Sequence, residues 1–165
     1  MNSDLQNRDE KASISQQQYI IFSSAGQDFA VDIMQTREIV DLSSLTKMPD
    51  APEFVSGVVN LRGNIIPVID LNKRLGGYQR ENNIEEYKVI IVAIQNQLLG
   101  LQVKNVKGIE KINKSEIVEA PEITQKINHS LMEGVGKLED KIILIIDLSG
   151  ILSTREVKKL KDHHN

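Results

Sequence analysis

Short aliphatic and aromatic runs separated by polar turns recur along the chain, and they predict β-strands rather than long helices. The first two runs, at 19–22 and 29–33, flank a glycine-containing turn and predict a hairpin. Segment 34–40 has charges between its apolar positions, so we expect about two helical turns or a surface loop there. Further strands are expected at 57–61, 65–69, 89–94, 98–103, 106–112 and 142–146.

A second hairpin is predicted at 57–71, and its tip carries the only charged residue before Asp70, Arg62. Arg62, Gly63 and Asn64 have the residue types of a tight turn. Pro67 lies inside the second strand, where it cannot donate a ladder hydrogen bond. This strand is therefore expected at a sheet edge or with a bulge at Pro67.

The second half of the sequence repeats the first. Residues 134–148 match 57–71 at 8 of 15 positions without a gap, and 89–103 align with 19–33 in the same order. The apolar strand positions are kept in both copies, whereas the Arg62 tip is acidic in the second copy, at 139–140. About five short strands per copy are too few for a robust open sheet. We therefore expect two small barrels packed on each other, at about 17–80 and 85–153.

The composition is that of an ordinary globular protein, with 40% apolar and 26% charged residues. Residues 1–16 are polar without periodicity and are expected to be a flexible tail, and 154–165 form a polar C-terminal end. The folded part would then be 17–153. No apolar run is long enough for a signal peptide or a transmembrane helix, which favours a cytoplasmic protein without membrane insertion.

Charge and residue types argue against several classes of chemistry. A net charge of -3 and a pI of about 5.7 give no attraction for nucleic acid. The absence of cysteine excludes disulfides, thiolate metal sites and a cysteine nucleophile. His129, His163 and His164 have no neighbouring Ser or spaced carboxylate that would form a catalytic or metal site. We expect no metal, no cofactor and no catalytic residue, and hence no enzyme.

Two aspartates, Asp70 and Asp147, occupy equivalent positions of the repeat. A pair of carboxylates can perform acid–base chemistry. Each aspartate also precedes a short run typical of a helix, however, and the first run stops at Gly76 and Gly77. We therefore favour two helix N-caps.

Several short motifs follow one another in a specific order between residues 18 and 152, although each is weak by itself. They are Phe29-x-Val31-x-Ile33, Glu38-Ile39, Pro52-x-Phe54-x-x-Gly57, Asn60-Leu61-Arg62-Gly63, Ile66-Pro67-Val68-x-Asp70-Leu71 and Gly134-x-Gly136. In this order they resemble the CheW family of chemotaxis coupling proteins. The resemblance implies an all-β fold, mainly β with short helices, built as two tandem five-stranded SH3-like barrels.

The resemblance also implies a function. Such an adaptor joins the cytoplasmic hairpin tip of methyl-accepting chemoreceptors to the regulatory domain of the histidine kinase CheA, catalyses no reaction, and is monomeric when isolated. It would be cytoplasmic and recruited to membrane-associated receptor arrays. A receptor helical hairpin suits an apolar groove with a few polar anchors, and arginine is frequent at interface hot spots. The matching positions for this receptor and kinase interface are Val31, Ile33, Glu38, Ile39, Gly57, Asn60, Leu61 and Arg62.

Other interpretations of the same residues stay open. Val31 and Ile33 alternate on one strand face and could be core residues. Gly57 could permit only a close backbone approach, and Glu38 and Arg62 could be solvated surface charges. A CheW-like paralogue in a pilus-motility or other chemosensory circuit would use the same groove. A small-ligand-binding module between the barrels is a third interpretation.

Overall fold

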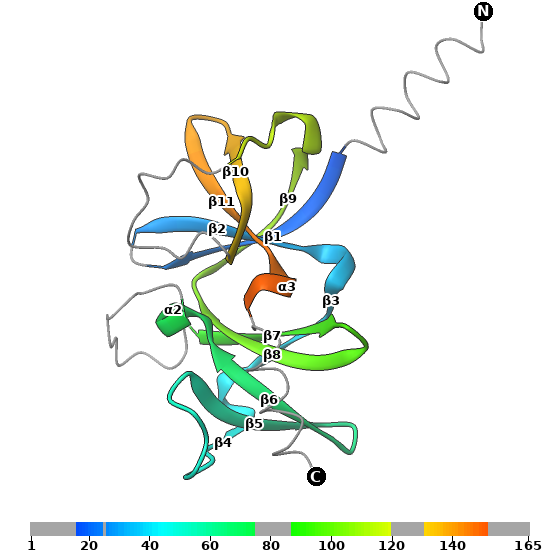
Figure 1. Ribbon diagram of the computed structural model, residues 1–165, viewed down its shortest axis with the longest axis vertical. Coiled ribbons are helices and arrows are strands. Elements are labelled where there is room, and N and C mark those ends of the chain that lie inside the picture. Colours follow the sequence, from blue (N-terminus) through cyan, green and yellow to red (C-terminus); the bar gives the residue numbers. More distant parts are fainter. Residues whose placement is uncertain (1–15, 25, 75–86, 120–130, 152–165) are drawn as a thin grey trace, which may run out of the picture.

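Two β-sheets make up most of the described chain. The structure, a computed structural model, describes residues 16–24, 26–74, 87–119 and 131–151. Sheet A has the order β10-β11-β2-β1-β9, and sheet B has the order β3-β7-β8-β6-β5-β4 (Figure 1). Sheet A contains β1 (Gln16–Ser24), β2 (Gln27–Asp32), β9 (Val106–Asn113), β10 (Met132–Leu138) and β11 (Lys141–Ile146). Sheet B contains β3 (Thr36–Asp41), β4 (Leu45–Thr46), β5 (Val55–Leu61), β6 (Asn64–Asp70), β7 (Tyr87–Ile94) and β8 (Gln97–Lys104).

The described helices are short, so the predicted mainly β fold with short helices is confirmed. Asp70 accepts a hydrogen bond from the backbone N of Lys73 at 3.2 Å, and Asp147 accepts one from the backbone N of Ser149 at 3.1 Å. Both aspartates are therefore the helix caps that the sequence predicts. The expected glycine stop at 76–77 lies outside the described residues, as do 1–15 and 152–165. The helices are η1 (Ile33–Gln35), η2 (Leu42–Ser44), α2 (Leu71–Arg74), η4 (Lys114–Glu116) and α3 (Leu148–Ile151).

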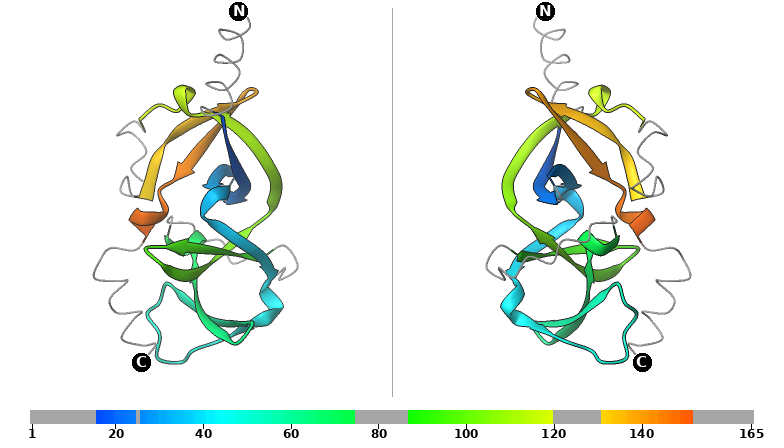
Figure 2. Two further views of the ribbon diagram at one scale, coloured as in Figure 1. Left: turned by 90° about the vertical axis from the view of Figure 1, so that its right-hand side faces the viewer. Right: turned by 90° about the vertical axis from the view of Figure 1, so that its left-hand side faces the viewer.

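Each sheet takes strands from both halves of the sequence. Sheet A joins hairpin β1–β2 to β9, β10 and β11, and sheet B joins hairpin β7–β8 to β3, β4, β5 and β6. In the side views of Figure 2, sheet A lies above sheet B, and the chain crosses between them from β2 to β3 and from β8 to β9. Each sheet therefore combines strands from both halves, whereas the barrels expected at about 17–80 and 85–153 would each contain the strands of one half. The difference arises because four strand pairings cross between the halves: the parallel pairs β2–β11 and β6–β8, and the antiparallel pairs β1–β9 and β3–β7.

These two parallel pairings have the same register. Ile145 pairs with Ala30 in sheet A, and Val68 pairs with Gly100 in sheet B. The two pairs are equivalent under the sequence repeat, so the molecule has an internal pseudo-symmetry. Small residues stand on β2 and β8 at this point because space is short: a Cβ on Gly100 would lie 2.9 Å from the Val68 side chain.

Strands β1 and β7 are buried on both faces. In β1, Ile20 and Phe22 pack into the cluster between the sheets, whereas Tyr19 and Ile21 pack inside sheet A. Strands covered on both faces have continuous rather than alternating apolar runs, which explains the sequences of these two strands. The same division occurs in β7, with Ile90 and Val92 between the sheets and Val89 and Ile91 inside sheet B.

Two local expectations were wrong. Segment 34–40 contains the end of η1 followed by β3, because Asp32 caps the backbone N of Met34 at 2.9 Å and β3 then pairs with β7. Pro67 is not on an edge strand, since β6 lies between β5 and β8, and the register shift of the β5–β6 pair lies between Val55 and Gly57 of β5 rather than at Pro67. The pairing of β6 with β8 begins at Val68, so the missing N–H of Pro67 falls outside that ladder.

Candidate functional site

A shallow hollow of ≈ 570 Å³ lies at the tip of hairpin β5–β6 in sheet B. The side chains around it carry two positive charges and one negative charge, together with three aliphatic groups and one amide. They come from β3, from hairpin β5–β6 and from hairpin β7–β8, so both halves of the sequence contribute. The lining residues are Arg37, Glu38, Leu61, Arg62, Asn64, Ile91 and Leu98.

Arg62 and Glu38 form a loose ion pair in this hollow. Nη2 of Arg62 lies 3.8 Å from Oε2 of Glu38, and the two side chains are 81% and 33% exposed. Arg62 (φ 52°) and Gly63 (φ 85°) form the two-residue turn of the hairpin, and this turn holds the guanidinium out toward solvent. An exposed pair of this kind contributes about 0–1 kcal/mol, so a competing carboxylate can open it at small cost.

Three of the eight residues predicted for an interface line the hollow together, namely Glu38, Leu61 and Arg62. Ile39 and Asn60 are exposed, but each lies next to a lining residue on its strand. Because side chains alternate across a strand, they point to the opposite sheet face from Glu38 and Leu61. Ile33 is half-buried in η1.

The other two predicted residues, Val31 and Gly57, are buried. Val31 packs in the cluster between the sheets. A Cβ on Gly57 would lie 2.2 Å from the carbonyl oxygen of Thr46, and one on the equivalent Gly134 would lie 2.6 Å from that of Val118. Both glycines therefore permit a close backbone approach, as one interpretation of Gly57 required.

Four lining residues had not been predicted from the sequence. Arg37 and Asn64 adjoin predicted residues along the chain. Ile91 and Leu98 belong to hairpin β7–β8, which the expected division into two barrels assigned to the other half. The pairing of β3 with β7 places Ile91 opposite Glu38, and the parallel pairing of β6 with β8 brings hairpin β7–β8 beside hairpin β5–β6.

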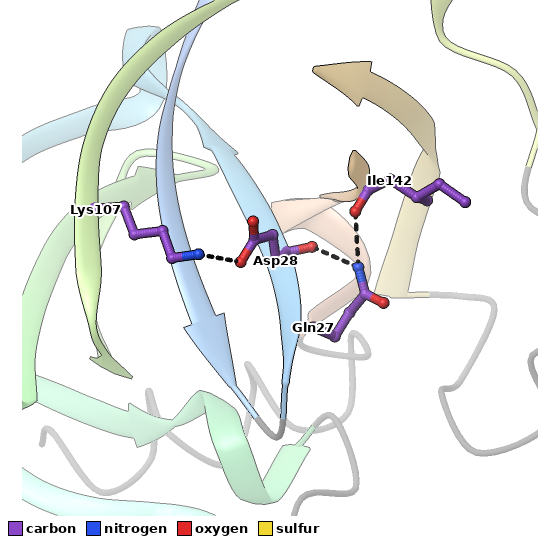
Figure 3. A network of polar contacts seen from close by, with 4 residues as sticks. All are labelled: Gln27, Asp28, Lys107 and Ile142. Atoms are coloured by element: carbon purple, nitrogen blue, oxygen red, sulfur yellow. Dashed lines mark hydrogen bonds and ion pairs between the residues drawn. The ribbon is translucent and has the colours of Figure 1, made fainter. Parts of the chain in front are cut away.

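The equivalent end of sheet A is closed by polar contacts (Figure 3). Lys107 Nζ lies 2.9 Å from Asp28 Oδ1, and Gln27 Nε2 donates to the backbone carbonyls of Asp28 and Ile142, each at 3.0 Å. Under the sequence repeat, Lys107 in β9 is equivalent to Arg37 in β3, and Asp28 is equivalent to Leu98. Arg37 and Lys107 each lie at a register shift of their own strand pair. The Asp28 side chain is only 13% exposed, so its ion pair is better shielded than the pair in the hollow.

Other chemical features lie away from the hollow. Burial, and after it the negative charges of Glu133 and Asp32, together raise the pKa of Tyr19, in the core of sheet A, to about 12. Within the described ranges, no group of three or more His, Asp or Glu residues is placed to hold a metal ion. In the same ranges, no helix has the length and apolar character needed to cross a membrane.

A family model described as a CheW-like domain matches residues 18–156. The chain belongs to the CheW family. Chemotaxis protein CheW of Rhizobium meliloti (strain 1021) is 32% identical over 137 residues, which cover 83% of this chain and 88% of that protein. CheW of Bacillus subtilis (strain 168) is 33% identical over 133 residues, covering 81% and 85% of the two chains.

Solved structures agree with this assignment. The crystal structure of the scaffolding protein TtCheW from Thermoanaerobacter tengcongensis matches with a TM-score of 0.77 and 38% identity, over 85% of this chain and 90% of that one. The CheW resemblance drawn from the sequence motifs is thereby confirmed, and so is the CheW-like fold.

Proposed function

We propose that this chain is a chemotaxis adaptor that couples chemoreceptors to the histidine kinase CheA in signalling arrays. The observation that carries the proposal is the match to the CheW family along residues 18–156. As a member of a scaffold family, the chain is not an enzyme, and its work consists of holding two other proteins together. It acts in the cytoplasm, at membrane-associated receptor arrays.

We assign the hollow on sheet B to the cytoplasmic hairpin tip of the receptor. A helical hairpin docks best on an apolar surface with a few polar anchors, and Leu61 and Leu98 supply the apolar part. Arg37 and Arg62 carry one more positive charge than Glu38 balances, so the hollow favours a partner that presents a carboxylate. That carboxylate replaces Glu38 at Arg62, because the existing ion pair is weak.

The remaining residues of the predicted interface surround this centre in different ways. Ile39 and Asn60 lie on the sheet face opposite Glu38 and Leu61, so we assign them to contacts outside the hollow, together with the half-buried Ile33 of η1. Val31 and Gly57 contribute indirectly, since Val31 packs in the cluster between the sheets and Gly57 lets β4 approach its partner β5 closely. The regulatory domain of CheA is the second partner, held at the same time as the receptor.

The test is kinase autophosphorylation in membranes that carry receptor, with increasing amounts of the wild-type chain or of Arg62→Glu. The substitution puts a second carboxylate beside Glu38 and repels the partner's acidic group. We expect the concentration for half-maximal stimulation to rise at least about tenfold, as for loss of an arginine hot spot. The melting temperature should not change, because Arg62 is 81% exposed.

Glu139→Arg is the matched control, because Glu139 occupies the equivalent tip position with φ 56°. It should stimulate the kinase as wild type does. Equal losses for the two variants would refute the assignment of the hollow to the receptor. If the wild-type chain stimulates no kinase with several receptors, the adaptor proposal fails for this circuit and the chain serves another chemosensory system.

A further inference from the structure

Each half of the chain lacks the strands needed to complete its own sheets. Among the described strands, β3 pairs only with β7, and β9 pairs only with β1. The first half alone would keep hairpin β1–β2 and the small group β4–β5–β6, and the second half would keep hairpins β7–β8 and β10–β11. Because isolated hairpins are at best marginally stable in water, each half needs the other in order to fold.

Polar side-chain contacts also join the two halves of the chain. Arg62 and Glu38 in the hollow both belong to the first half, but several of the longest-range side-chain contacts join the two halves. The network of Figure 3 is one group of them, since Gln27 and Asp28 come from the first half and Lys107 and Ile142 from the second. Further contacts of this kind join Ser56 to Gln102, Arg74 to Ile151, and Asp41 to Lys88.

We propose that the first half of one copy also completes the second half of another copy, so that two chains form an exchanged dimer. Each of its two bodies contains residues 16–74 of one chain and 87–151 of the other. All described strand pairings and polar contacts between halves are kept, and residues 75–86 of each chain connect the two bodies. A chain of that length can reach roughly 40 Å when extended.

The partner in this dimer is specific. Only the first half of another copy offers β1–β2 in the register that β9 and β11 accept, with an aspartate opposite Lys107. Each hollow then takes Arg62 from one chain and Leu98 from the other. The dimer would carry two complete hollows and bind two partners at once.

The balance between monomer and exchanged dimer depends on concentration. The short covalent connection holds the two halves of one chain at an effective concentration in the millimolar range, so dilute refolding gives monomer. Chains that refold together near 1 mM should exchange halves to a measurable extent. The product should persist on dilution, because separation requires both bodies to unfold.

The natural absence of cysteine allows a direct test with full-length chains. One chain carries Asp41→Cys and the other carries Lys88→Cys. These positions are direct partners in the antiparallel pair of β3 and β7, and both side chains are partly exposed. Directly opposed residues lie within the distance range of a disulfide. A single-cysteine monomer cannot close this bond, whereas an exchanged dimer can.

The two chains are unfolded together, refolded near 1 mM, diluted and oxidised, and the mixed disulfide dimer is measured on a non-reducing gel. We expect at least about ten times more mixed dimer than from the same chains mixed after folding. The double variant Asp41→Cys/Lys88→Cys shows that the bond closes within one chain. If it closes there while co-refolding gives no excess over mixing, the halves do not exchange and the proposal is wrong.

Discussion

Replacement of Gly57 by alanine tests the close approach of the end of β4 to its partner strand β5. The new Cβ would lie 2.2 Å from the carbonyl oxygen of Thr46 and 3.1 Å from Cα of Lys47. The first distance is about 1 Å shorter than ordinary van der Waals contact, and both neighbours are backbone atoms that move only together with β4. Overpacking and the positive φ of 153° should together cost about 3 kcal/mol.

For a chain of this size, that loss corresponds to a fall in melting temperature of about 6–12 °C, measured by circular dichroism. Gly136→Ala is the control, since its Cβ would lie 3.3 Å from a side-chain methyl of Ile112, which can yield. Val59 fills the equivalent position of the first repeat, so the fold accepts a side chain there. Equal melting temperatures for Gly57→Ala and Gly136→Ala would refute the reasoning.

Two further predictions concern sheet A. The raised pKa of Tyr19 means that its neutral form is preferred in the folded state, so the stabilisation is complete below pH 10 and is lost as pH rises toward 12. Urea unfolding should show this loss, about 2–3 kcal/mol at most, and Tyr19→Phe should remove that part of the pH dependence. Lys107→Met should lower the free energy of unfolding by about 1–2 kcal/mol, because it leaves the shielded Asp28 without its cation. Lys141→Met, at an exposed position, should cost less than about 0.5 kcal/mol, and equal losses would contradict the role of the Asp28 pair.

Local features of the fold could be predicted from the sequence. Alternation and turn residues located the hairpins at 19–33, 57–71 and 89–103, because a hairpin depends on residues that are close together in the chain. The repeat predicted two equivalent units. It did not predict which strands share a sheet, because the parallel pairs β2–β11 and β6–β8 depend on packing between distant segments. The strand at Thr36–Asp41 was missed for the same reason, since its partner β7 is distant in the sequence.

The candidate site shows a similar limit. Glu38, Leu61 and Arg62 were selected from motif positions, and the fold brings them together in one hollow. Ile91 and Leu98 could not be selected, because no local pattern distinguishes them from other core and strand residues. Gly57 is explained by the backbone of Thr46, a neighbour that the sequence alone does not identify.

Hairpin β1–β2 lies among strands of the second half, and hairpin β7–β8 lies among strands of the first half. This exchange of hairpins affects how the chain folds during translation. Hairpin β1–β2 begins at Gln16 but lies between β9 and β11, and β11 ends at Ile146. A ribosome that adds about 5–20 residues per second needs roughly 7–26 s to pass from one to the other. During that time the apolar run at Tyr19–Phe22 and its unpaired strand edges remain open to other chains. Sheet A can therefore close only near the end of translation, and the nascent first half depends on protection from aggregation until then.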